Sequence, residues 1–302
     1  MFIQGYTRNS FIIVSMNAIA PTSKPADYIQ LVDSIGKVFI IAYKEPTGLL
    51  EEILSKEKFQ YEILRQEHKP EYQTYSRSYL CLMNHYRAWE KAVQESKPTL
   101  IIEADFVPVV NFGKLPLPFH PHQKDVGISW LYTCAPQIYS VSETGYAEGF
   151  STAMVAYIIN QQSAKYLIEL AEEINQKYGT NAYSSWDSDI DKFLRKKALK
   201  NYIPFRNYGE HGGLPNLEHY KNGLSKNHRA DVLYGKLAFL PFYASAERGG
   251  KENLLTARIQ ARLKGIARLL LGKFLRIPVI QGSRTPTRLI SFAIRRQLSF
   301  YL

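Results

Sequence analysis

The chain has 302 residues, of which 45% are hydrophobic and 13% aromatic, and it carries 38 Lys and Arg residues against 27 Asp and Glu residues. This apolar content excludes an intrinsically disordered protein. The two cysteines, Cys81 and Cys134, match no metal-ligand spacing and are too few for a disulfide-rich secreted scaffold. The formal net charge is +11, but residues 251–302 hold 11 basic residues against Glu252 alone, so the basic charge belongs to the C-terminal segment.

Short apolar runs alternate with helical patterns along the first hundred or so residues. Uninterrupted apolar runs predict buried strands at residues 11–14, 38–41 and 99–102. Apolar residues spaced three and four apart predict helices over residues 27–35, 49–58 and 79–95. This repeated order of strand and helix predicts an α/β protein whose sheet carries helices on both faces.

The middle of the chain continues the pattern. Strands are predicted at residues 126–131 and 154–159, and helices at residues 163–177 and 192–199. Residues 111–122 contain three prolines and one glycine without strong periodicity, which predicts a loop. We expect a domain over residues 1–240 and a basic helical tail over residues 241–302.

Glu103 and Asp105 end the strand predicted at residues 99–102. Residues two apart in an extended chain point to the same side, and ligands of α/β sheets bind beyond the carboxyl ends of the strands. Two carboxylates at such an edge are typical of a Mg²⁺ or Mn²⁺ site that also binds substrate phosphates. The alternative is a solvated acidic edge paired with a nearby lysine.

A motif in the preceding helix supports the functional alternative. Residues 81–93 read CLMNHYRAWEKAV, and Glu103-Ala104-Asp105 follows ten residues later. This segment resembles the signature of glycosyltransferase family 25, in which a Cys-x-x-Ser-His-x-x-x-Trp helix precedes a strand that ends in Glu-Asp-Asp. Cys81, His85 and Trp89 match in order and spacing, whereas Asn84 replaces the serine and Ala104 replaces the middle aspartate.

The family includes lipopolysaccharide sugar transferases of bacteria and procollagen galactosyltransferases of animals. The resemblance, which extends over about residues 10–230, implies a GT-A-type, Rossmann-like mixed sheet and a nucleotide-sugar donor bound with a divalent cation, Mn²⁺ or Mg²⁺. It implies that Glu103 and Asp105 are metal ligands. His85 is expected to bind the donor or the acidic strand end, or else to be a hydrogen-bonded core residue. Cys81 is expected to be a small buried residue.

Two later segments hold further candidates. Asp189 and Asp191, with Asp187 behind them, are candidates for the general base that deprotonates the acceptor hydroxyl, although each could instead stabilise the start of a helix. The segment 208–216 is rich in glycine, which allows close backbone approach to a phosphate or sugar. By resemblance to GT-A enzymes, His211 would join the metal and Glu210 and Gly212 would bind the donor, with His219 and His228 as weaker candidates. The alternative for this segment is a plain tight turn.

The C-terminal segment has the pattern of a basic amphipathic helix. Apolar residues recur three or four apart along one stripe, and basic residues flank it, which is typical of a helix that lies on an anionic membrane. The same helix could instead pack on the catalytic domain with its basic face in solvent. Nucleic-acid binding is not expected, because the segment has long aliphatic runs and lacks the interleaved Gly, Ser or aromatic residues of a typical single-strand binder.

The sequence therefore predicts a sugar transferase of bacterial surface polysaccharide synthesis, with a glycan or lipid-linked acceptor. No apolar run is long enough to span a membrane and no export signal is evident, so we expect a cytoplasmic protein that can attach to the inner membrane. The alternative, motivated by Ala104, is a membrane-associated binding protein that keeps this fold without turnover.

Overall fold

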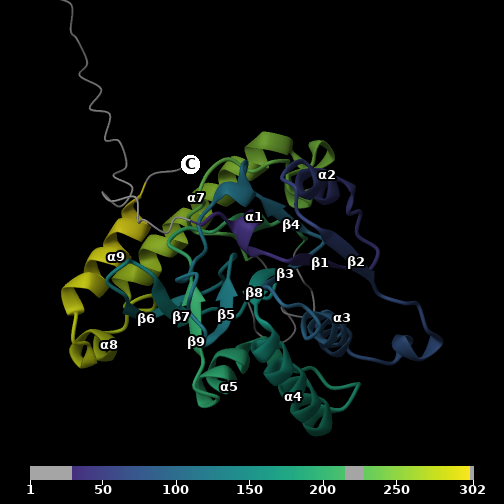
Figure 1. The fold of residues 1–302 in the computed structure, drawn as a ribbon. Coiled ribbons are helices and arrows are strands. Elements are labelled where there is room, and N and C mark those ends of the chain that lie inside the picture. Colours follow the sequence, from purple (N-terminus) through teal and green to yellow (C-terminus); the bar gives the residue numbers. More distant parts are fainter. Residues whose placement is uncertain (1–28, 215–227, 300–302) are drawn as a thin grey trace, which may run out of the picture.

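The computed structural model describes residues 29–214 and 228–299 (Figure 1). Its central layer is a mixed sheet of eight strands in the order β2-β1-β3-β8-β5-β9-β7-β6, and β10 pairs with β4 in a separate two-stranded sheet. The strands are β1 (Lys37–Ala42), β2 (Tyr61–Arg65), β3 (Thr99–Glu103), β4 (Phe106–Pro108), β5 (Val126–Trp130), β6 (Gln137–Val141), β7 (Ala147–Phe150), β8 (Ala156–Ile159), β9 (Lys200–Ile203) and β10 (Gly209–His211).

Helices cover both faces of this sheet (Figure 1). They are α1 (Leu31–Ser34), α2 (Gly48–Lys56), α3 (Arg77–Ala92), α4 (Gln161–Tyr178), α5 (Ile190–Lys196), α7 (Gly250–Leu270), α8 (Ile277–Gly282) and α9 (Pro286–Leu298). The described residues therefore form an α/β fold with a mixed sheet flanked by helices, as predicted, and the arrangement is consistent with a GT-A-like architecture.

Alternation along the central strands divides the apolar core into two clusters, one on each face of the sheet. In β3, Ile101 packs with Leu82 and Trp89 of α3, whereas Leu100 and Ile102 pack in the cluster that holds α2. Strands β1, β2 and β3 run parallel, so their carboxyl ends meet at one edge. This edge is where Glu103 emerges from the core.

The structure confirms most of the predicted elements that it describes. Strands β1, β3, β5 and β8 and helices α2, α3, α4 and α5 lie within a few residues of their predicted bounds. The strand predicted at residues 11–14 lies outside the described residues. Strands β2, β4, β6, β7, β9 and β10 were not predicted, because short strands with polar or aromatic residues give no long apolar run.

Residues 241–299 pack against the preceding chain. Phe274, Leu289 and Phe292 belong to the same core cluster as α3 and α4. Arg296 of α9 is fully buried and forms an ion pair with Asp231, at 2.5 Å between Nη1 and Oδ2. The expected basic tail is thus helical, and its described part shares the core of the residues before it instead of extending away from them.

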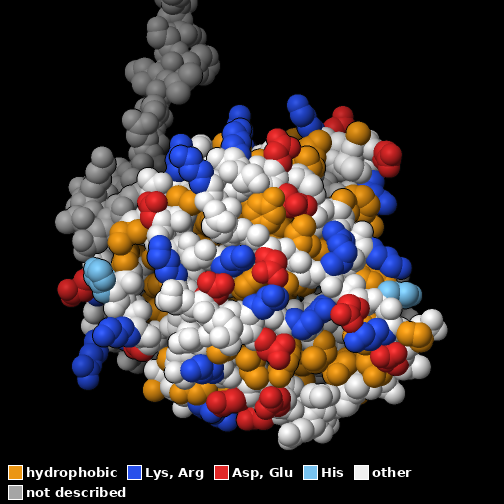
Figure 2. All heavy atoms as spheres, turned by 45° about the vertical axis from the view of Figure 1, so that its right-hand side comes forward, with side chains coloured by type: hydrophobic (Ala, Val, Ile, Leu, Met, Phe, Trp, Pro, Cys, Tyr) orange, Lys and Arg blue, Asp and Glu red, His pale blue; other side chains and the backbone are white. Residues whose placement is uncertain are grey.

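Charge is evenly mixed on the side of the molecule that includes α2 and β2. Figure 2 shows Lys and Arg side chains interspersed there with Asp and Glu, and apolar side chains between them.

Among the described residues, no helix is long and apolar enough to cross a membrane.

Candidate functional site

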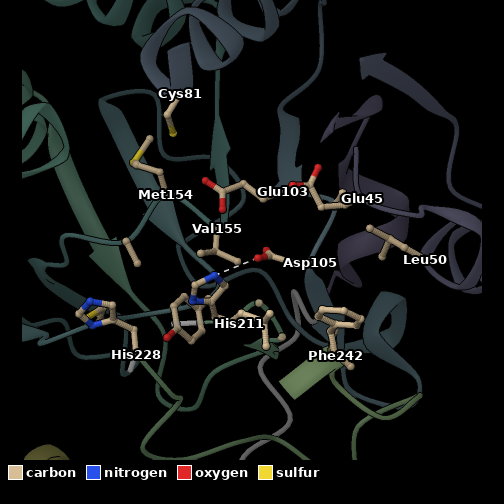
Figure 3. Close-up of a pocket in the computed structure, with 18 of the residues that line it drawn as sticks. Glu45, Leu50, Cys81, Glu103, Asp105, Met154, Val155, His211, His228 and Phe242 are labelled. Atoms are coloured by element: carbon tan, nitrogen blue, oxygen red, sulfur yellow. Dashed lines mark hydrogen bonds and ion pairs between the residues drawn. The ribbon is translucent and has the colours of Figure 1, made fainter. Parts of the chain in front are cut away.

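A cavity of about 940 Å³ opens beyond the carboxyl end of β3. Its wall includes Glu103, Ala104 and Asp105, which lead from β3 into β4, and His211 at the end of β10 (Figure 3). The antiparallel pairing of β10 with β4 places His211 opposite Phe106, directly beside Asp105. The tertiary fold thus brings together residues that lie more than 100 positions apart, at the edge where α/β proteins bind ligands.

Glu103, Asp105 and His211 form one cluster. Their potential ligand atoms all lie within 4.8 Å of one another, and His211 Nε2 lies 3.0 Å from Asp105 Oδ2. Figure 3 shows the three side chains converging on the same part of the cavity. Two carboxylates and one imidazole are a donor set suited to Mn²⁺ and other divalent cations.

Asp105 and His211 shift each other's pKa in opposite directions. Burial by itself raises the pKa of Asp105, but the charge and hydrogen bond of His211, with Arg229 nearby, outweigh burial and hold that pKa below its ordinary value. Burial lowers the pKa of His211, and the Asp105 carboxylate outweighs this effect and raises it. Asp105 is therefore ionised at neutral pH and can offer a negative charge to a cation.

Two buried polar atoms indicate that the cluster can hold an ion. Asp105 Oδ1 and His211 Nδ1 are both buried, and neither has a hydrogen-bond partner in the described part of the chain. Buried polar atoms are nearly always satisfied, so an unpartnered carboxylate oxygen beside a second carboxylate is placed to accept a ligand. The residues present fit a divalent cation.

Ala104 leaves the two carboxylates of this cluster in place. Its side chain belongs to the apolar core cluster that contains Ile102 and Phe106, although it also borders the cavity. The residues on either side of it, Glu103 and Asp105, supply the carboxylates. The departure from the family motif therefore falls at the position that packs against apolar neighbours.

His85 lies behind the cluster instead of in the cavity wall. It is fully buried, with Nδ1 2.9 Å from the Tyr157 hydroxyl and Nε2 3.2 Å from Glu103 Oε1. Of the expected roles, His85 makes the contact with the acidic strand end from a core position, and it does not reach the donor because its side chain has no exposed surface. Its contact orients Glu103, and Trp89 Nε1 donates to the same Tyr157 hydroxyl.

Cys81 was expected to be buried. It is only partly buried and borders the cavity near Glu103. It lies on α3 one turn before His85. The three residues that match the family motif, Cys81, His85 and Trp89, therefore extend along α3 from the cavity wall into the core.

The glycine segment after β10 contacts the acidic strand end closely. Gly212 N donates to the Asp105 carbonyl at 2.8 Å, and a Cβ on Gly212 would lie 2.8 Å from that same oxygen. A Cβ on Gly213 would collide with the Asp105 carboxylate. Only glycine allows this approach, so the segment is a built part of the site and not a solvent-exposed turn.

Glu210 points away from the cavity. It is fully buried and accepts hydrogen bonds from Arg258 Nη1 at 2.7 Å and from the Ala230 backbone N–H at 2.9 Å. The expectation that Glu210 binds the donor is corrected, because alternation along β10 places His211 and Glu210 on opposite sides. Glu210 instead ties β10 to helix α7.

Of the three candidate general bases, the structure places Asp187 at the cavity and not Asp189 or Asp191. Asp189 is exposed and Asp191 is buried between Tyr139 and Asn201, and neither lines the cavity. Both expectations are corrected, since the start of α5 faces away from the site. Asp187, considered only behind them, does line the cavity, and burial together with the Glu103 charge raises its pKa to about 6.

Two cations at the cavity wall were not predicted from the sequence. Lys44 follows β1 and Arg77 begins α3, and both are exposed side chains that line the cavity. The parallel order of β1 and β3 predicts that their carboxyl ends meet, which could have identified Lys44. Arg77 carries no comparable signal.

Of the two weaker histidine candidates, His228 lines the cavity, with Nδ1 2.8 Å from Cys134 Sγ. His219 lies outside the described residues.

A second groove, of about 700 Å³, shares Leu214 with the cavity and runs along one side of α7. Its described lining includes Arg229, Arg248 and Lys264 and no acidic residue. The groove therefore suits an anionic group.

No protein-family model matches the chain, and no curated protein matches it. Among solved structures, the chain is similar to one described as a glycosyltransferase involved in the glycosylation of the major capsid of PBCV-1, with 8% identity and a TM-score of 0.37. The similarity covers 55% of this chain and 80% of that one. A likeness of this size establishes neither a family nor a substrate, so the resemblance to glycosyltransferase family 25 stays a prediction.

Proposed function

We propose that this protein is a metal-dependent glycosyltransferase of the hexosyltransferase type, related to family 25, that uses a nucleotide-sugar donor. The observation that carries the proposal is the convergence of Glu103, Asp105 and His211 in one cavity, with Asp105 Oδ1 buried and unpartnered among the described residues. Mn²⁺ or Mg²⁺ bound by these residues would neutralise the negative charge that develops on the leaving diphosphate.

The surrounding residues support the same reaction. Lys44 and Arg77 at the cavity wall provide positive charge for the donor diphosphate. Asp187 lines the cavity and can accept the proton of the acceptor hydroxyl. The acceptor oxygen then bonds to the anomeric carbon as the bond from that carbon to the phosphate oxygen breaks, and the nucleoside diphosphate leaves.

The acceptor is expected to be a glycan or a lipid-linked sugar of bacterial surface polysaccharide synthesis. The basic groove beside the cavity, whose described lining holds no acidic residue, supports an acceptor that carries negative charge, such as a phosphate. We place the reaction at the cytoplasmic face of the inner membrane.

A thermal-shift screen against UDP-, GDP-, CMP- and dTDP-sugars, with and without Mn²⁺, tests the proposal. A donor at a hundredfold excess over its Kd should stabilise the protein by about 2.7 kcal/mol, because it binds the folded state alone. We expect stabilisation by one nucleotide class that requires the metal. If no donor stabilises the protein with or without Mn²⁺, the transferase proposal is wrong and a binding protein without turnover becomes the better description.

Asp187→Asn should remove activity and stabilise the fold. Loss of the general base should lower transfer by at least about 100-fold. The pKa of Asp187 is raised from 3.8 to about 6, so ionisation of this carboxyl opposes folding increasingly between these two pH values and fully above the higher one. The variant should gain about 1–3 kcal/mol of unfolding free energy at pH 8 and nothing below about pH 3, where both states are protonated.

Chemical denaturation at several pH values and initial rates measure these two effects. Asp189→Asn, an exposed carboxylate two residues away, is the matched control and should leave both unchanged. If the Asp187→Asn variant is less stable than the wild type at pH 8 and keeps the wild-type transfer rate, Asp187 is a structural residue.

A further inference from the structure

Helix α7 is oriented with its small and basic residues toward the protein. Its buried residues are Arg258, Ala261 and Gly265. A Cβ on Gly265 would lie 2.8 Å from both Asp231 Cβ and Gln297 Oε1, so the glycine allows the helix to approach closely. The buried Arg258 pairs with Glu210, which fixes the rotation of the helix about its axis.

This rotation leaves the apolar stripe of α7 in solvent. Leu255, Ile259, Leu263 and Leu270 recur on one side of the helix, and Leu263 and Leu270 are 62% and 80% exposed. A soluble helix ordinarily turns such a stripe toward the core. In α7 the opposite side packs, so this stripe has no intramolecular partner of comparable size in the described structure.

Helix α9 presents a second stripe of the same kind. Ile290, Ile294 and Leu298 are spaced four apart and all are exposed. The two helices pack against each other, and Arg262 of α7 donates to the Ser299 carbonyl at the end of α9 at 3.0 Å (Figure 1). We call these seven residues the C-terminal face: Leu255, Ile259, Leu263, Leu270, Ile290, Ile294 and Leu298.

Exposed basic side chains lie on the same C-terminal segment. Lys251, Lys273 and Arg284 are exposed, and no acidic side chain of the described chain forms an ion pair with them. Residues 251–302 contain one acidic residue, Glu252, against 11 basic residues. Two such surfaces would repel each other, whereas an anionic surface would attract them, so charge favours an acidic partner over a second copy of this chain.

We infer that the C-terminal face binds the surface of an anionic lipid bilayer, with its apolar residues among the acyl chains and its lysines at the headgroups. Exposed leucine and isoleucine beside unpaired lysine is the chemistry that recognises such an interface. This inference goes beyond the proposed transfer reaction. Membrane binding would also serve the proposed reaction. Another side of α7 lines the basic groove next to the cavity, where an acceptor held in the membrane would arrive.

Flotation with phosphatidylcholine vesicles, with and without phosphatidylglycerol, tests the inference on the full chain. We expect at least about tenfold more bound protein on the anionic vesicles. Leu263→Glu with Leu270→Glu should remove this binding, since both side chains are exposed and their replacement leaves the fold intact. Val110→Glu, the same kind of change at one exposed apolar residue of another segment, should bind as the wild type does.

Asp105→Asn separates this inference from the proposed function, because the variant should lose donor binding and keep vesicle binding. Equal binding to neutral and anionic vesicles, or no effect of the double replacement, would overturn the inference. Sedimentation in the absence of lipid tests the competing occupant of this face, a second copy of the chain. A wild-type dimer that Leu263→Glu converts to a monomer would show that the C-terminal face is an interface between copies of the chain.

Discussion

Asp105→Asn is expected to lower metal-dependent turnover of the nucleotide-sugar donor by at least about 100-fold. The amide has nearly the size and shape of the carboxylate, so packing around the strand end should change little. What is lost is the negative charge that faces His211 at 3.0 Å and that would hold the cation. Release of nucleoside diphosphate from the donor at saturating Mn²⁺ measures the effect, and Asp105→Asn should also lose the metal-dependent thermal shift.

Asp189→Asn is the control for this replacement. It makes the same chemical change at an exposed carboxylate that does not line the cavity, so turnover should stay within about twofold. If Asp105→Asn and Asp189→Asn reduce turnover equally, the cavity at the end of β3 is not the site of reaction. The comparison also tests Asp189, which the sequence offered as a general base and which the structure leaves outside the cavity.

Arg258→Ala is expected to lower the free energy of unfolding by about 3–5 kcal/mol. Arg258 is buried in α7 and its guanidinium donates to Glu210 Oε2 at 2.7 Å and to the Ala230 carbonyl at 2.6 Å. Burial raises the pKa of Glu210 and Arg258 opposes this effect. Removing the guanidinium leaves a carboxylate with no exposed surface and without its ion-pair partner. Because Glu210 precedes His211 in β10, donor binding should weaken as well.

A double-mutant cycle isolates this pair. Arg258→Met combined with Glu210→Gln removes both charges, so it should recover much of the stability lost in Arg258→Met alone. Lys251→Ala changes an exposed cation at the start of the same helix and should alter stability by less than about 0.5 kcal/mol. Additive single effects in urea denaturation would show that Arg258 and Glu210 do not stabilise each other.

Several features of the candidate site follow from local pattern. The apolar run before Glu103 predicts a buried strand, and the carboxyl end of such a strand reaches the ligand-binding edge of an α/β sheet. The spacing of Glu103 and Asp105 places both carboxylates on one side. These are properties of neighbouring residues, so they could be inferred without knowledge of the rest of the chain.

The partners of these residues depend on contacts between distant segments. His211 reaches Asp105 only because β10 pairs with β4, and a three-residue strand leaves no periodicity to detect. The same pairing turns Glu210 to the opposite side, toward α7. The acidic residues near α5 were equivalent by pattern, yet the short helix that begins at Trp186 places Asp187 in the cavity and leaves Asp189 in solvent.

In the C-terminal segment, too, some features follow from local sequence and others from contacts between distant segments. Its sequence determines that residues 250–270 form a helix with an apolar stripe and flanking basic residues, because the period of 3.6 residues depends on local spacing alone. Which side of that helix packs was decided by tertiary contacts. The pair of Arg258 with Glu210 and the close approach at Gly265 outweigh burial of the leucine stripe. A buried charge must be paired, and its partner lies 48 residues away, beyond the reach of any local pattern.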